Sequence, residues 1–212
     1  MIVLSHRGYW KDAAEKNQPV AFRRSFDLGF GTETDVRDRN GELVISHDPP
    51  RGGEMSFDEM LDILGGRDLP LAVNVKADGL ADAIKAAFAK RPHLTRWFLF
   101  DMSVPDMVQQ LKRGNPVFAR LSEYEPTVPD RVANACDGVW LDGFDGQWWS
   151  PELVGEWAAR GKQVCVVSPD LHKRDPEACW AGLAAHPFAA PDRVMICTDR
   201  PEQAAAVFGG SR

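Results

Sequence analysis

The chain alternates between short apolar runs and longer segments whose apolar residues recur with the period of a helix. The apolar runs are rich in β-branched residues, which suits buried strands better than helices. The predicted strands are Ile2–Ser5, Gly31–Val36, Leu43–Ser46, Leu71–Lys76, Trp97–Asp101, Val117–Arg120, Gly138–Leu141, Gln163–Val167 and Arg193–Cys197. The predicted helices are Val20–Leu28, Phe57–Leu64, Leu80–Ala89, Pro105–Leu111, Pro151–Ala159, Pro176–Ala184 and Pro201–Val207. This alternation indicates βα units and a parallel sheet.

One pair of strands breaks the alternation. Asn40-Gly41 is a strong hairpin signal, so we expect Leu43–Ser46 to fold back antiparallel on the strand before it. Without that arm, eight βα units remain and predict a closed (β/α)8 TIM barrel, with an open sheet as the alternative that counting leaves. Such barrels usually need about 250 residues. The chain has 212, so the barrel must be compact, with short loops.

Reactive or charged side chains follow almost every predicted strand. In a barrel these strand ends meet at one face, where active sites are built. Turns are polar whatever their function, so the argument depends on whether the chemistry of the clusters fits together. The clusters concerned are Ser5-His6-Arg7, Glu33-Thr34-Asp35, Ser46-His47-Asp48 and Asn74-Val75-Lys76.

Glu33 and Asp35 are two apart on one strand, so their side chains point the same way. Two buried carboxylates side by side repel each other, and a divalent cation would resolve the repulsion. Oxygen ligands favour Mg²⁺ or Ca²⁺ over Zn²⁺. The alternative is a solvated edge strand with alternating polar residues.

Asn74 and Lys76 repeat this spacing on the next parallel strand. Asn74 can offer an amide oxygen to the same cation. Lys76 can offer its charge to an anion, since a lysine in an apolar strand is costly unless it is paired. The alternative for Lys76 is an exposed strand terminus.

His6 and His47 both follow apolar runs, and their neighbours Arg7 and Asp48 are charged. Two imidazoles at one site suit the roles of general base and general acid, and Asp48 could orient His47. A cation, a lysine, an arginine and two histidines describe a site for a phosphate ester.

Two further residues are weaker candidates for substrate contacts. Glu123 lies just past a predicted strand, where a surface loop is the alternative. Trp149 lies in a loop next to Trp148, where aromatic rings can line a substrate pocket.

Composition narrows the partners. The formal net charge is -6, from 31 acidic and 25 basic residues, which argues against a nucleic-acid binder. No apolar run is long enough for a transmembrane segment, and the N-terminus has no basic region typical of a signal peptide. We therefore expect a cytoplasmic protein whose four widely spaced cysteines are reduced and buried. Its oligomeric state is not indicated.

Several motifs together resemble those of the glycerophosphodiester phosphodiesterase family, within the phosphatidylinositol-phospholipase-C-like phosphodiesterase superfamily. They are His6-Arg7-Gly8, Asn17, Ala21-Phe22, Gly29, Glu33-Thr34-Asp35, the run from Asn40 to Asp48, and Thr198-Asp199-Arg200-Pro201-Glu202. The resemblance spans the first strand to the last, and is loose between about Pro105 and Pro191.

The resemblance implies a TIM barrel that hydrolyses a small-molecule phosphodiester of glycerol phosphate or a similar polyol phosphate. It implies that His6 and His47 are the acid–base pair and that Glu33 and Asp35 are metal ligands. It also implies that Arg7 and Lys76 contact the phosphate.

The chain departs from the family pattern at three places. Asn74 stands where the family usually has a glutamate as third metal ligand, which predicts weaker metal binding. Lys16 stands where glutamate is usual before Asn17. The short link between His47 and Asn74 has no room for the family's common insertion subdomain, so we expect a more open site.

Two alternatives to a hydrolase stay open. One is a catalytically weak barrel that binds a phosphate or a sugar phosphate. The other is a lyase-like enzyme that releases a cyclic phosphate.

Overall fold

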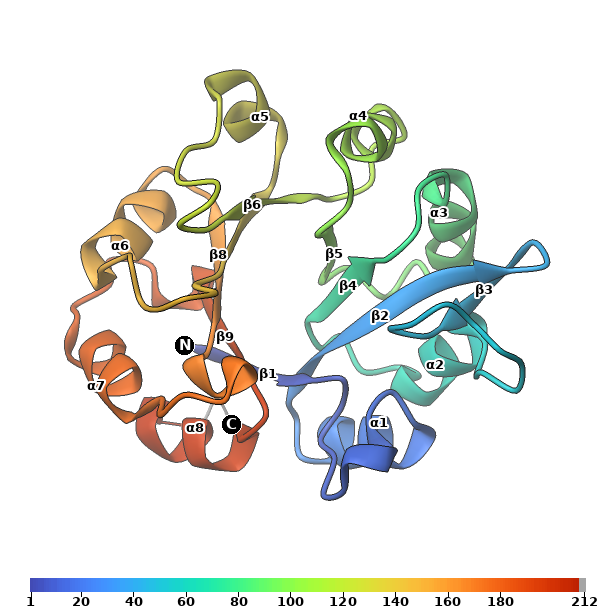
Figure 1. Cartoon of the computed structure of the whole chain (residues 1–212), viewed down its shortest axis with the longest axis horizontal. Coiled ribbons are helices and arrows are strands. Elements are labelled where there is room, and N and C mark those ends of the chain that lie inside the picture. The colour runs from blue at the N-terminus through green and yellow to red at the C-terminus, as the bar shows by residue number, and fades with distance from the viewer. Residues whose placement is uncertain (210–212) are drawn as a thin grey trace. The chain divides into compact units, whose positions relative to one another are not determined.

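The structure, a computed structural model, describes residues 1–209. It divides into two compact units. Unit 1 consists of residues 1–6 and the chain from residue 118 onward, and unit 2 consists of residues 7–117. Figure 1 labels the helices and strands of both.

The strands of unit 1 lie in the order β1-β9-β8-β7-β6, and each neighbouring pair is parallel. The strands are β1 (Ile2–His6), β6 (Phe118–Leu121), β7 (Gly138–Leu141), β8 (Gln163–Val167) and β9 (Val194–Thr198). The helices are α5 (Asp130–Ala135), α6 (Pro151–Ala159), α7 (Glu177–Ala185) and α8 (Pro201–Phe208), with 3₁₀ turns η2 (Pro169–His172) and η3 (Pro191–Arg193). Figure 1 shows α6, α7 and α8 on the outer side of these strands.

Unit 2 has the strand order β5-β4-β2, also parallel, with β3 antiparallel on β2. The strands are β2 (Gly31–Arg39), β3 (Glu42–Ile45), β4 (Leu71–Val75) and β5 (Trp97–Phe100). The helices are α1 (Pro19–Asp27), α2 (Phe57–Leu64), α3 (Ala81–Ala89) and α4 (Val104–Lys112), and η1 (Ala13–Glu15) is a 3₁₀ turn.

Each of the eight parallel strands has an α-helix before the next parallel strand or after the last. This is the repeat of the (β/α)8 TIM-barrel class, and the predicted fold is confirmed. The predicted hairpin is also confirmed, because β2 and β3 pair antiparallel around Asn40 and Gly41, whose φ angles of 53° and 85° suit a type I′ turn. Residues 46–70, all described, hold only α2 and its connections, so no subdomain is inserted there.

A hydrophobic core holds the helices of unit 2 against its strands. Phe22 of α1, Phe57 of α2 and Ile84 of α3 are fully buried in one cluster with Val73 of β4. The start of α2 is fixed by a capping box between Ser56 and Glu59. Val36 of β2 belongs to the same cluster, so apolar burial reinforces the parallel pairing of β2 with β4.

All four cysteines are free and buried, as expected. Burial raises the pKa of the Cys136 thiol to about 11 and that of Cys179 to about 12. Both are therefore inert thiols rather than nucleophiles.

Within residues 1–209, no helix combines the length and the apolar character needed to cross a membrane.

Candidate active site

Two buried carboxylates lie two residues apart within β2. Glu33 is 2% exposed and Asp35 is fully buried. The register of β2 and β4 sets Asp35 directly beside Asn74. The structure therefore brings together the three residues that the sequence predicts as cation ligands, and the alternative of a solvated edge strand is wrong.

Two cations lie against Asp35. Arg7 Nε is 3.0 Å from Asp35 Oδ2, and Lys76 Nζ is 3.6 Å from Asp35 Oδ1. Both cationic side chains are 21% exposed, so each also reaches solvent, where a second anion could meet it. The Arg7 backbone N–H donates to Glu33 Oε2 at 3.2 Å.

Burial and a neighbouring carboxylate both act on Glu33. Burial first, and then the charge of Asp35, raise the pKa of Glu33 well above its ordinary value, against the pull of Arg7 and Lys76. Desolvated carboxylates in contact favour a proton or a cation between them. Arg7 and Lys76 offset part of this repulsion.

Two buried oxygen atoms at this point lack a hydrogen-bond donor. They are Asp35 Oδ1 and Asn74 Oδ1. An unsatisfied buried acceptor costs about 1–3 kcal/mol, and two such oxygens beside a second carboxylate match the preference of Mg²⁺ or Ca²⁺. Among residues 1–209 no group of three or more His, Cys, Asp or Glu is arranged to hold a metal ion.

Asn17 supports this site and was not predicted as a site residue. Its Nδ2 donates to Asp35 Oδ2 at 2.9 Å, and its Oδ1 accepts from the Thr34 hydroxyl at 3.0 Å. The Asn17 N–H also donates to the Arg7 carbonyl. Asn17 therefore fixes the orientation of the Asp35 carboxylate. The only signal for it in the sequence is its place in the family-like motif.

The backbone is strained around the same residues. Non-glycine residues with positive φ include Arg7 at 58°, Asn17 at 59° and Asp101 at 66°. Such conformations cost about 1–3 kcal/mol each and cluster at functional sites. Arg7 and Asn17 contact Asp35, and Asp101, just after β5, contacts Asn74.

His47 follows β3 in the same unit. Its Nδ1 is 2.9 Å from Asp48 Oδ1, and its carbonyl accepts from Arg37 Nε at 3.0 Å. The hydrogen bond to His47, with the charge of that ring, lowers the pKa of Asp48, and Arg7 contributes to the same shift. The His47 side chain is 45% exposed, so its other ring nitrogen is accessible.

A second histidine–carboxylate pair lies in unit 1. His6 Nδ1, at the end of β1, is 2.7 Å from Asp199 Oδ1, just after β9. Asp170 Oδ2 accepts from the Asp199 N–H and the Thr198 hydroxyl, each at 2.8 Å. Asp199 and Asp170 were not predicted as site residues, although Asp199 belongs to the closing motif.

The two weaker candidates have structural surroundings in unit 1. Glu123 Oε1 accepts from the Asp145 N–H at 2.6 Å, and such backbone hydrogen bonds lower the pKa of Glu123 although burial opposes them. Trp149 is only 6% exposed. Both stay predictions as substrate contacts, and Glu123 Oε2 is buried without a hydrogen-bond partner.

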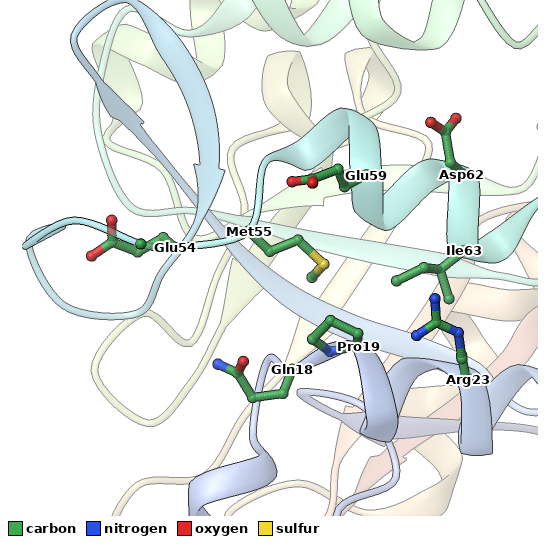
Figure 2. A pocket seen from close by; sticks show the side chains of 9 residues that line it. Gln18, Pro19, Arg23, Glu54, Met55, Glu59, Asp62 and Ile63 are labelled. Carbon is green, nitrogen blue, oxygen red and sulfur yellow. The ribbon is translucent and has the colours of Figure 1, made fainter.

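A groove of about 660 Å³ lies between α1 and α2, and Figure 2 shows Pro19 and Arg23 on one side with Met55 and Ile63 on the other. Its carboxylates have local partners. Glu54 accepts from the Gly52 N–H, and Glu59 closes the capping box of α2. Neither Glu54 nor Glu59 is therefore available as an acid–base or metal-binding group in this groove.

Gly8 allows the His6-Arg7-Gly8 turn to lie against α1. Its φ is +79°, and an added Cβ would come within 2.8 Å of Ala21 Cβ. We expect Gly8→Ala to lower the free energy of unfolding by about 2–4 kcal/mol, from left-handed strain and overpacking together. Urea denaturation measures this.

The matched control is Gly79→Ala, because Gly79 has a φ of +90° and nothing within 4 Å of the added Cβ. It should cost only the strain, about 1 kcal/mol. Equal losses in the two variants would contradict the close approach of the turn to α1.

The chain is similar in structure to several solved glycerophosphodiester phosphodiesterases. That from Agrobacterium tumefaciens has a TM-score of 0.75 and 19% identity, over 99% of this chain and 100% of that chain. That from Parabacteroides distasonis has a TM-score of 0.74 and 18% identity, over 98% and 96%. A phosphodiesterase from Oleispira antarctica, in complex with the product sn-glycerol-3-phosphate, has a TM-score of 0.69 and 15% identity, over 99% and 97%.

No protein-family model matches the chain, and no curated protein matches it significantly. At these identities the solved structures show the fold. It is the fold that the motif resemblance implies.

Proposed function

We propose that the protein is a divalent-cation-dependent phosphodiesterase that cleaves a diester of glycerol phosphate or of another polyol phosphate. The observation that carries the proposal is the buried pair Glu33 and Asp35 with two unsatisfied oxygens and two flanking cations. The complex of the Oleispira antarctica phosphodiesterase with sn-glycerol-3-phosphate supports the substrate class.

Glu33, Asp35 and Asn74 would hold the cation, and Mg²⁺ or Ca²⁺ fits these oxygen donors. A bound cation would act as a Lewis acid that stabilises negative charge on the phosphoryl oxygens. Arg7 and Lys76 add positive charge to the same group, and their partial exposure leaves donors for it.

His6 and His47 transfer the protons. Each ring has its Nδ1 on a carboxylate, Asp199 or Asp48, and in this proposal Nε2 would be the atom that exchanges the proton with the substrate. One imidazole takes the proton from the attacking oxygen, which belongs to water or to the substrate's own hydroxyl, as the new P–O bond forms; a cyclic phosphate formed by that hydroxyl is then opened by water. The other gives a proton to the leaving alcohol oxygen as the old P–O bond breaks.

The test is cleavage of bis(p-nitrophenyl) phosphate and of a glycerophosphodiester, with Mg²⁺, with Ca²⁺ or with a chelator. Turnover that requires the cation supports the proposal. Binding of diesters without turnover of any of them would instead identify a phosphate-binding barrel.

Phosphorus NMR of the products distinguishes hydrolysis from a lyase-like reaction. A phosphomonoester is expected as the end product. A cyclic phosphate that accumulates and is never opened would show that the enzyme uses the substrate's own hydroxyl and stops there.

Asn74→Glu should strengthen Mg²⁺ binding by about tenfold, because a carboxylate adds the charge that the amide lacks. Isothermal titration calorimetry of the two proteins without substrate measures the change. Unchanged or weaker affinity would count against Asn74 as a ligand.

A further inference from the structure

Asp101 directly follows β5, the strand that pairs with β4. Its carboxylate contacts Asn74, the proposed cation ligand that carries no charge of its own. Its Oδ2 accepts a hydrogen bond from Asn74 Nδ2 at 3.3 Å. The strand register places Asn74 between Asp35 on one side and the end of β5 on the other. Asp101 thus contacts Asn74 from the side away from Asp35.

This contact decides which way the Asn74 amide faces. A carboxylate accepts only, so it selects the NH₂ end of the amide. The oxygen end is then directed elsewhere, and Asn74 Oδ1 is buried without a donor. Asn74 itself is 6% exposed. An amide turned the other way would present hydrogens to the carboxylate pair and no ligand to a cation.

The backbone of Asp101 supports a specific role for it. Its φ is 66°, in the left-handed region that is uncommon for residues other than glycine. Aspartate and asparagine tolerate that conformation better than other side chains. The fold thus accepts local strain at the residue that faces the Asn74 amide.

We propose that Asp101 is a positioning residue for the cation site. It holds the Asn74 amide with its oxygen toward Glu33 and Asp35. Its carboxylate also places near the site the negative charge that Asn74 lacks. The inference rests on the proposed function, because it assumes that these residues bind a cation. It extends the acidic set to a residue on β5.

The first test is Asp101→Asn, which keeps the size and tolerates the same backbone conformation but removes the charge. Calorimetric titration with Mg²⁺ or Ca²⁺ alone, without substrate, should show affinity about tenfold weaker, the range expected when a partner of a metal ligand is lost. Asp78→Asn is the matched control. Asp78 is an exposed carboxylate in the same unit that accepts from the Ser103 hydroxyl, and its removal should leave the affinity unchanged.

A second variant pair separates positioning from general damage to the fold. In Asn74→Asp there is no NH₂ group to orient, and Asp101 would face another carboxylate. Adding Asp101→Asn to the Asn74→Asp protein should leave the cation affinity unchanged or raise it. The same substitution in the wild type should lower the cation affinity. A reversal of this kind does not follow from a merely structural role.

Three outcomes decide the matter. Weakening in Asp101→Asn that disappears in the Asn74→Asp background supports the proposal. A wild type that binds a cation, with Asp101→Asn binding it equally well, overturns the role of Asp101 alone. A wild type that binds neither cation overturns both this role and the cation site of the proposed function.

Discussion

His47→Ala should lower kcat for diester cleavage by about 10²–10⁴-fold, the usual contribution of a positioned acid or base. His6→Ala should cause a loss of the same order. Both rings are held by a carboxylate at Nδ1, so each variant removes a group whose orientation the protein maintains. Initial rates with a cation and a saturating diester measure the effect.

The double variant tests whether the two histidines belong to one reaction. If each is needed in the same step, removing both should cost little more than removing one, because residues that act as a unit are strongly non-additive. Multiplicative losses would instead indicate independent roles.

His93→Ala is the control for loss of a histidine. Its ring contacts the Gly65 carbonyl at 2.9 Å from an exposed position, and the rate should not change. His47→Ala with more than one tenth of wild-type activity would rule out the proposed proton transfer at that residue.

Local patterns in the sequence predict the fold well. The runs at Gly138–Leu141 and Gln163–Val167 are strands with the bounds expected, because apolar β-branched runs between turn residues are unambiguous. Helix α5 was missed. It has six residues, of which only Ala133 is buried, so it carries no apolar stripe that a periodicity could reveal.

In the candidate site, too, some features follow from local sequence and others depend on the fold. Glu33 and Asp35 are two residues apart on one strand, and their common direction follows from strand geometry alone. The pairing of His6 with Asp199 joins positions 193 residues apart. Asn17 and Asp101 likewise reach Asp35 and Asn74 only through the fold. Many polar residues follow predicted strands, and the sequence does not show which of them contact one another. Such partners can be identified only once the strand order and register are known.

Asp35→Asn should abolish cation binding and reduce diester cleavage by about 10³-fold. The substitution keeps the shape of a buried side chain but removes one of only two carboxylates in the proposed donor set. It also leaves Arg7 and Lys76 without their buried counter-charge. Calorimetry with Mg²⁺ or Ca²⁺ and initial rates measure the two losses, and circular dichroism verifies that the variant is folded.

Asp106 provides the contrast, because it is also a buried aspartate of unit 2, at 3% exposure. It accepts from the Gly79 N–H at 2.8 Å and from Gln110 Nε2 at 3.0 Å. Asp106→Asn should therefore cost about 1–3 kcal/mol of unfolding free energy, with cation affinity and kcat unchanged. If Asp35→Asn instead loses stability alone and keeps both cation binding and turnover, Asp35 has the same structural role as Asp106, and the catalytic site must be sought elsewhere in the chain.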